Sequence, residues 1–275
     1  SGQGAAHWIT RQIDARQVEG TNAREMQRWI DAYGEDSDFV RVRVKGQFPR
    51  SSSMQFITDE AVAAARKREA SAHLHDPLIC GVDVARFGDD QTVIALRKGR
   101  DARSLPWIKL RQADTMAVAA KVAELHRHYR FDAIHVDGGG VGGGVIDRLR
   151  QLNVAVREVQ FGGKADRNQL DIDPARYANK RAEMWGTMRQ ALDGLAIPDD
   201  PELAADLTGV QYGLNARDEI QLERKADMKR RDLASPDCGD ALALTFAYPV
   251  FPSAQAGGPQ APWRQNVVAT EYDPF

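Results

Sequence analysis

The sequence predicts a mixed α/β fold from residue 78 onward, and three observations support it. Short apolar runs typical of strands recur between residues 78 and 159. Segments with the apolar spacing of helices, such as residues 114–129, lie between several of these runs. Two of the runs are joined by the polar turn Gly88-Asp-Asp90, which indicates a β-hairpin.

Composition restricts the class of protein. The 275 residues are enough for one or two domains with a sizeable core, and the net charge of −2 argues against a surface coated in positive charge. The two cysteines form no CxxC pair, so neither a disulfide framework nor a structural zinc site is expected. No apolar run approaches the ~20 residues of a transmembrane helix, and the first residues lack signal-peptide character. We expect a soluble intracellular protein without a membrane partner and, since the chain opens without Met, a fragment.

The first 76 residues are expected to contain helices and one strand. A polar helix is predicted from residue 1 to about residue 35, where Gly34 can end it. Within residues 39–45, valines alternate strictly with Arg or Lys, which predicts a strand with one basic face. A short helix is predicted from Thr58 to about residue 70.

The remaining elements follow in order. Strands are predicted at residues 78–82, 92–96, 107–110, 133–136 and 154–159, and helices at 114–129, 145–152 and 177–192. Residues 207–222 are expected to form a hairpin. Ser235-Pro-Asp237 then opens the last helix, with Ser235 as the capping side chain and proline in the first turn. After Pro249 the composition shifts to Pro, Gly, Ala and Gln, which predicts a mobile tail.

Three acids lie where metal ligands could gather. Asp83 and Asp137 end predicted strands, and Asp240 lies in the first turns of the last helix. The carboxyl ends of neighbouring parallel strands open onto one crevice, so distant acids can converge there. Converging carboxylates repel one another and are stable mainly around a hard cation such as Mg²⁺ or Mn²⁺. Asp237, three residues before Asp240 on the same helix face, is a fourth candidate ligand. A single acid at a strand end is more often a turn or cap residue than a metal ligand, and three in one α/β unit make the two interpretations about equal.

Other segments have two interpretations. Asp89 and Asp90 suit a turn first and an auxiliary metal site second. The glycine-rich stretch 138–144 could admit a nucleic-acid backbone or be a flexible loop, and without a following lysine it is no Walker A loop. A basic segment before the last helix could grip phosphates or be a solvated hairpin. Its candidate DNA-binding residues are Arg224, Lys225, Lys229, Arg230 and Arg231.

Four blocks of sequence together resemble the nuclease domain of the large terminase subunits of tailed phages. The blocks are Gly81-Val-Asp83-Val-Ala85, Ile134-His-Val-Asp137-Gly-Gly-Gly-Val-Gly142, Asn179-Lys-Arg-Ala-Glu-Met-Trp185 and Ser235-Pro-Asp-Cys-Gly-Asp240-Ala-Leu-Ala-Leu-Thr-Phe246. Residues 33–49 also resemble the segment that joins the ATPase domain of that family to its nuclease. The resemblance covers roughly residues 29–248. Gly239 departs from the alanine more usual in the family, a change expected to matter little.

The resemblance implies an RNase H-like fold, a central mixed sheet flanked by helices, with its first three strands antiparallel. It implies a nuclease that uses two divalent cations, Mg²⁺ or Mn²⁺, and cuts concatemeric viral DNA. The family's metal-binding acids fall on Asp83, Asp137 and Asp240. Residues 1–76 would be a linker and helical segment after a missing ATPase domain, residues 77–248 the nuclease domain and residues 249–275 a mobile tail.

The implied partners are double-stranded viral DNA, the portal protein and the small terminase subunit, in the host cytoplasm, with the fragment itself monomeric. One cation would activate the attacking water and the other would stabilise the leaving 3′-oxygen. Little sequence preference is expected, because no base-reading motif is present.

Three alternatives remain open. A sugar-kinase or actin-like ATPase would need two related halves with phosphate loops, and only one such half is evident. Other RNase H-like nucleases, the resolvases and transposases, share the acid trio but lack the last two blocks. A non-catalytic DNA- or capsid-docking module would use the basic strand face at residues 41–45 and the tail, and its binding would survive loss of Asp137.

Overall fold

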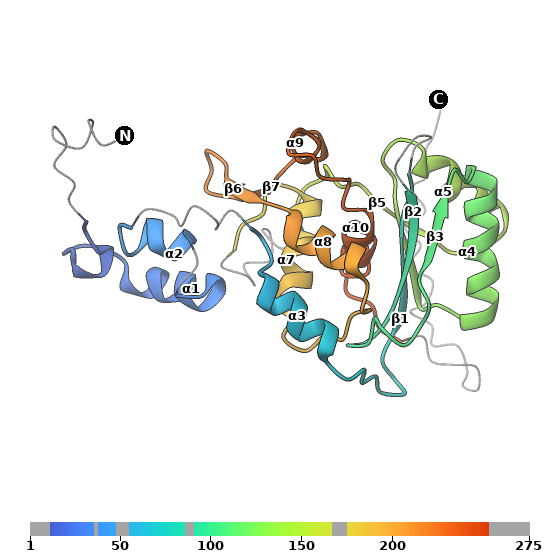
Figure 1. Ribbon diagram of the computed structural model, residues 1–275, viewed down its shortest axis with the longest axis horizontal. Helices are drawn as coiled ribbons and strands as arrows, with labels where there is room; N and C mark the ends of the chain where they lie inside the picture. The colour runs from blue at the N-terminus through green and yellow to red at the C-terminus, as the bar shows by residue number, and fades with distance from the viewer. Residues whose placement is uncertain (1–11, 36–37, 48–54, 86–90, 167–174, 253–275) are drawn as a thin grey trace, which may run out of the picture.

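The computed structural model describes residues 12–35, 38–47, 55–85, 91–166 and 175–252 (Figure 1). Within these residues no helix is long and apolar enough to cross a membrane. The tail expected at residues 249–275 lies outside the description apart from its first four residues, as does the start of the predicted N-terminal helix.

The described elements of the N-terminal segment are helical, but the single helix predicted up to residue 35 is wrong for residues 12–22. Only a 3₁₀ turn lies there, because Asn22 caps a separate helix that begins at Ala23. A 3₁₀ turn, η2 (Ala15–Gln17), is followed by α1 (Ala23–Tyr33), α2 (Asp38–Arg43) and α3 (Asp59–Lys67). Gly34, with φ of 80°, ends α1 as predicted. The Thr58 hydroxyl accepts a hydrogen bond from the Ala61 amide and caps α3.

The strand predicted at residues 39–45 is wrong, because this segment contains α2. Val40 and Val44 are completely buried, whereas Val42 is 47% exposed. Residues four apart share one face of a helix, so burying Val40 with Val44 against Met26 of α1 selects the helix over the strand. The alternating pattern is local, and the apolar surface of α1 overrides it.

A five-stranded mixed sheet forms the centre of the molecule. Its strands are β1 (Leu78–Asp83), β2 (Gln91–Lys98), β3 (Ile108–Arg111), β4 (Ala133–Asp137) and β5 (Arg157–Val159), in the order β3-β2-β1-β4-β5. The first three strands are antiparallel, and β4 and β5 extend the sheet in parallel from β1. The predicted hairpin is therefore confirmed, although its turn at residues 86–90 lies outside the described residues.

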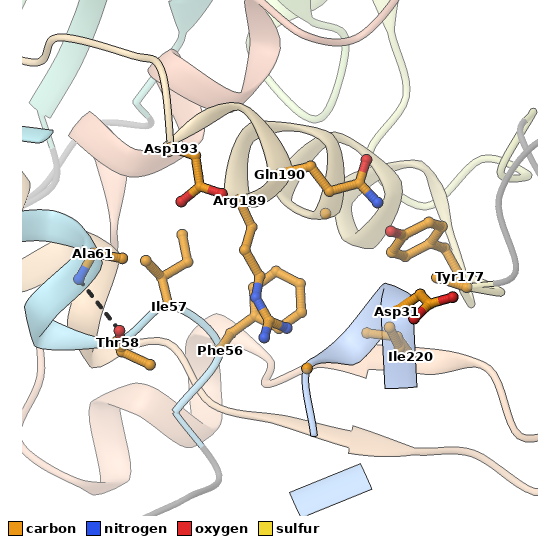
Figure 2. A pocket seen from close by; sticks show the side chains of 13 residues that line it. Asp31, Phe56, Ile57, Thr58, Ala61, Tyr177, Arg189, Gln190, Asp193 and Ile220 are labelled. Carbon is orange, nitrogen blue, oxygen red and sulfur yellow. Dashed lines mark hydrogen bonds between the residues drawn. The ribbon is translucent and has the colours of Figure 1, made fainter. Parts of the chain in front are cut away.

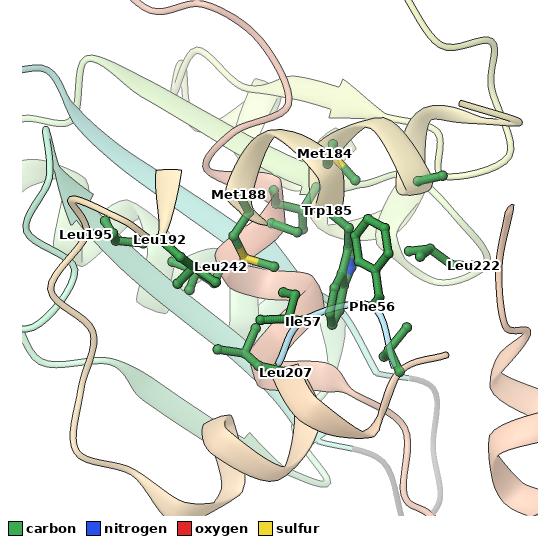
Figure 3. Packing of buried hydrophobic residues seen from close by; sticks show 14 of the residues in the cluster. Phe56, Ile57, Met184, Trp185, Met188, Leu192, Leu195, Leu207, Leu222 and Leu242 are labelled. Atoms are coloured by element: carbon green, nitrogen blue, oxygen red, sulfur yellow. The ribbon is translucent and has the colours of Figure 1, made fainter. Parts of the chain in front are cut away.

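Helices cover both faces of the sheet (Figure 1). One face carries α4 (Thr115–Tyr129) and α5 (Gly142–Gln151), and the other carries α7 (Lys180–Ala191), α8 (Pro201–Gly209) and α10 (Asp237–Leu244). Each face has its own apolar cluster. Figure 3 shows Trp185 and Met188 of α7 packed with Leu242 of α10 in the second of these clusters. Burying a side chain of this size contributes roughly 1.5–3 kcal/mol, so this core holds α7 and α10 together.

Two elements near the C-terminus differ from expectation. The predicted hairpin is present as β6 (Tyr212–Leu214) and β7 (Ile220–Leu222), but Leu207 belongs to α8, which Asp200 caps and Pro201 begins. The basic segment after the hairpin forms a short helix, α9 (Lys225–Arg230).

The cap of α10 also differs from expectation. Ser235 makes no side-chain cap, because Pro236 takes the N-cap position. The carboxylate of Asp206 on α8 instead accepts hydrogen bonds from the amides of Cys238 and Gly239, at 2.8 and 3.2 Å. The amides that would otherwise be unpaired at the start of α10 are thus satisfied from a neighbouring helix.

Candidate active site

Strand register brings the first two acids together. The parallel strands β1 and β4 pair Val82 with Val136, so the next positions, Asp83 and Asp137, lie side by side where both strands end. The apolar runs are buried in the sheet and stop at these acids, which places the carboxylates at the edge of the core.

Close packing of α10 on β1 brings the other two acids, Asp237 and Asp240, to the same end of the sheet. A Cβ built on Gly81 would stand 2.2 Å from the carbonyl oxygen of Ala241, so only glycine allows α10 to lie this close to the strand. Asp240 immediately precedes Ala241, and Asp237 lies one turn earlier. All four predicted acids therefore gather at the carboxyl end of β1, where the other three raise the pKa of Asp83.

The acids stand in a largely buried setting. Asp83, Asp237 and Asp240 are buried, and Asp137 is half-buried. Burial raises the pKa of Asp83 well above its usual value, and the other three carboxylates raise it further against the opposing effect of Lys225. Burial also raises the pKa of Asp137. Such a cluster is costly unless positive charge neutralises it.

Lys225 of α9 supplies part of that positive charge. Its Nζ lies 3.1 Å from Oδ2 of Asp240, 3.5 Å from Oδ2 of Asp83 and 3.6 Å from Oδ1 of Asp237. Burial alone lowers the pKa of Lys225, but the three carboxylates outweigh it and leave that pKa above its ordinary value. The predicted DNA-binding lysine therefore lies among the acids.

Asp240 receives two further partners from α7. Arg181 Nε and Trp185 Nε1 each donate a hydrogen bond of 2.8 Å to Oδ1 of Asp240. Although burial would raise the pKa of Asp240, Arg181, Lys225 and these hydrogen bonds lower it. Oδ2 of Asp240 is buried and accepts no hydrogen bond. Sequence analysis placed Arg181 and Trp185 in one block of the resemblance and gave neither a role; the available signal was their spacing of four residues on one helix.

The four carboxylates are the chemical type of ligand that binds a hard divalent cation, but a cation would have to displace Lys225. Among the residues that the structure describes, no three Asp, Glu, His or Cys side chains are arranged to hold a metal ion, and the Lys225 ammonium stands between the carboxylates. The ligands available are carboxylate oxygens, which Mg²⁺ and Mn²⁺ prefer. Oδ2 of Asp240, which accepts no hydrogen bond, offers such a cation a buried acceptor.

The other predicted DNA-binding residues lie around α9. Arg231 pairs with Glu223, and Arg230 pairs with Asp227 one turn away. Arg224 is the N-cap residue of α9, and Lys229 lies in its last turn. Asp89 and Asp90 lie outside the described residues.

A cavity of about 360 Å³ lies away from these acids, and none of the predicted site residues lines it (Figure 2). It is enclosed by the end of α1, residues 56–61 and the C-terminal half of α7. Arg189 extends across it with its guanidinium over the ring of Phe56, 5.2 Å from the ring centroid.

Comparison with known proteins identifies similar chains, although no family model matches. The chain is 25% identical over 228 residues to a probable terminase large subunit of Enterobacteria phage P7. That match covers 78% of this chain but 45% of the phage P7 protein, so the chain spans about half the length of its curated relative.

Solved structures match the fold. The nuclease domain of the large terminase subunit gp2 of bacterial virus Sf6 superposes with a TM-score of 0.60 at 19% identity, over 70% of this chain and 98% of that one. Mutants of the Sf6 domain, solved with calcium and with manganese, give TM-scores of 0.60 and 0.58 at 18% identity, each over 70% of this chain and 99% of the other. The chain is therefore similar in sequence to a phage large terminase subunit and in fold to the nuclease domain of such a subunit, and its mixed sheet flanked by helices is RNase H-like.

Proposed function

We propose that this chain is the nuclease part of the large subunit of a viral DNA-packaging terminase, a divalent-metal-dependent endodeoxyribonuclease that cuts concatemeric double-stranded DNA. The observation that carries the proposal is the convergence of four carboxylates at one end of the sheet, with an oxygen of Asp240 buried and without a hydrogen bond. The similarity to terminase nuclease domains supports the same activity.

Four carboxylates of the chain would hold the metal ions. Asp83, Asp137, Asp237 and Asp240 provide the oxygen ligands. When bound, two divalent cations, Mg²⁺ or Mn²⁺, would supply Lewis-acid chemistry at the attacking water and at the leaving 3′-oxygen. Asp137 is the least buried of the four acids, so the phosphodiester would approach from its side of the cluster.

Lys225 would have two states. Without metal, its ammonium neutralises the acids and holds them together. Its side chain is 36% exposed and comes from the six-residue helix α9, so it can leave the cluster without disturbing the sheet. Once Lys225 has left the acid cluster, it would contact DNA phosphates next to the site, together with Arg224 and Lys229.

The remaining assignments complete the proposal. Residues 1–76 would follow an ATPase domain and link it to a nuclease domain at residues 77–248, with residues 249–275 as a tail. The partners would be viral DNA, the portal protein and the small terminase subunit in the host cytoplasm. The fragment would be monomeric, and cleavage would depend little on DNA sequence because the chain holds no base-reading sequence motif.

Plasmid cleavage tests the proposal. Supercoiled plasmid is incubated with the chain in Mn²⁺, Mg²⁺ or EDTA, alongside Asp137→Asn and the matched control Asp147→Asn, which changes an exposed carboxylate on α5. We expect metal-dependent nicking and linearisation that Asp137→Asn abolishes and Asp147→Asn retains.

Two outcomes would contradict the proposal. Absence of cutting together with absence of Mn²⁺ binding by calorimetry would overturn the nuclease and leave a docking module. A strong preference for four-way junctions over linear duplex would instead indicate a resolvase type of RNase H-like nuclease.

A further inference from the structure

Two side chains from one helix hold the same oxygen of Asp240. Arg181 and Trp185, four residues apart on α7, donate through Nε and Nε1 to Oδ1 at 2.8 Å each, and neither donates to Oδ2. A carboxylate held at one oxygen by two donors from different directions cannot rotate freely about its Cβ–Cγ bond. The other oxygen is therefore held in one direction.

The two donors are themselves held in place. Nη1 of Arg181 donates to the carbonyl of Glu223 at 3.1 Å, and its guanidinium lies 5.6 Å from the centre of the Trp185 ring system. Trp185 is fully buried among the residues of α7 and α10. The orientation of Asp240 thus depends on rigid helix packing rather than on a mobile loop.

A purely structural network would satisfy both oxygens. Oδ2 of Asp240 is buried and accepts no hydrogen bond, which is costly for a carboxylate. Its charged neighbour Lys225, 3.1 Å away, belongs to a different short helix and keeps 36% of its side chain exposed. The arrangement leaves one preoriented oxygen whose present counter-ion can be exchanged.

We propose that Arg181 and Trp185 are positioning residues that orient Asp240 so that its Oδ2 binds a divalent cation. This inference rests on the proposed nuclease function and adds to it the residues that prepare one metal ligand. Hydrogen-bond partners behind a metal ligand typically change metal affinity by about 10- to 100-fold when they are replaced.

Calorimetric titration of the full chain with Mn²⁺ tests this positioning role. Trp185→Phe removes the N–H donor and keeps an aromatic ring, and Arg181→Lys keeps the charge and removes the Nε donor. The matched controls are Trp107→Phe, whose indole donates to the Ala102 carbonyl at 3.0 Å, and Arg189→Lys, two turns further along α7. We expect Mn²⁺ affinity to fall about 10-fold or more in the first two variants and to stay unchanged in the controls.

Two further readouts separate positioning from a loss of structure. In the unmodified chain, the indole ¹H–¹⁵N resonance of Trp185 should shift on titration with Mg²⁺, while that of Trp107 stays in place. In plasmid cleavage, Trp185→Phe should need about 10-fold more Mn²⁺ for half-maximal rate and recover the original rate at saturating Mn²⁺.

The outcomes are distinguishable. If the unmodified chain binds no Mn²⁺, the proposed function fails. If it binds Mn²⁺ and both variants bind as tightly as the controls, the positioning role fails alone. If Trp185→Phe does not fold, the NMR titration of the unmodified chain still tests the inference. A Trp185 indole resonance that does not shift when Mg²⁺ is added would overturn it.

Discussion

The backbone of Gly239 on α10 lies directly against the indole ring of Trp185 on α7. A Cβ built on Gly239 would stand 2.8 Å from Cη2 and 2.9 Å from Cζ2 of that ring, closer than real Cβ atoms come to their neighbours. The same indole donates its hydrogen bond to Asp240. Glycine at this position therefore lets α7 approach α10 and hold the acid.

Replacing Gly239 by alanine should displace the Trp185 ring. We expect the free energy of unfolding to fall by about 1–3 kcal/mol, the usual cost of overpacking a core, measured by urea denaturation. Gly143→Ala on α5 is the control, because a Cβ there meets nothing within 4 Å, and it should raise stability by about 0.5–1 kcal/mol. Equal effects of the two substitutions would contradict the close approach.

Removing the ammonium of Lys225 should change how the chain responds to metal. In EDTA, Lys225→Ala should be less stable than the unmodified chain, because three buried carboxylates lose a counter-ion. Added Mn²⁺ should stabilise the variant more, since no ammonium competes with it. An affinity about 10-fold tighter would add about 1.4 kcal/mol at saturating metal, which thermal unfolding measures.

The matched control for Lys225 is Lys229→Ala, one turn further along the same helix. It removes an equal charge from α9 outside the acid cluster, so Mn²⁺ should stabilise it as much as the unmodified chain. Equal gains in both variants would show that Lys225 does not compete with a cation.

The imidazole of His135 should make stability depend on pH. Burial lowers the pKa of His135 from 6.5 to about 4, with Arg157 and Arg97 lowering it and a hydrogen bond to the Leu244 carbonyl opposing them. The folded chain therefore holds a neutral imidazole that the unfolded chain protonates below pH 6.5. The stability contributed is complete above pH 6.5 and is lost as the pH falls toward 4, by about 2 kcal/mol at pH 5.

Urea denaturation in EDTA at pH 7 and pH 5 measures this loss. The variant His135→Gln does not titrate in this range, so its free energy of unfolding is the reference at each pH. The difference between the two proteins should change by about 2 kcal/mol between these pH values. A difference that is the same at both would contradict the neutral buried imidazole.

Val42 of α2 and Val44, the residue that follows this helix, test the helix against the strand that the sequence predicted. Val44 is completely buried and Val42 is 47% exposed. Val44→Ala should lower the free energy of unfolding by about 2 kcal/mol, and Val42→Ala should change it by less than about 0.5 kcal/mol. Similar losses from both would favour a strand, in which Val42 and Val44 share a face.

Much of the sheet, and the position of two acids at the ends of its strands, could be predicted from local sequence. Apolar runs that stop at Asp83 and Asp137 indicated both the strands and the carboxylates at their ends. Charged residues are unfavourable in the buried part of a strand and occur where the strand ends. A glycine that ends a helix and a threonine that begins one are likewise local signals, which explains why the end of α1 at Gly34 and the start of α3 at Thr58 were predicted correctly.

Only the tertiary structure decided how the site is completed. Gly81 lets α10 approach β1, Asp206 caps α10 from a different helix, and Lys225 enters the acid cluster. Arg181 and Trp185 reach Asp240 across more than fifty residues of sequence. The segment 39–45 contains a helix because it packs against α1, a separate segment that the alternating pattern of residues 39–45 does not reveal. The sequence by itself determined which chemistry was present, and packing between distant segments determined which charges meet.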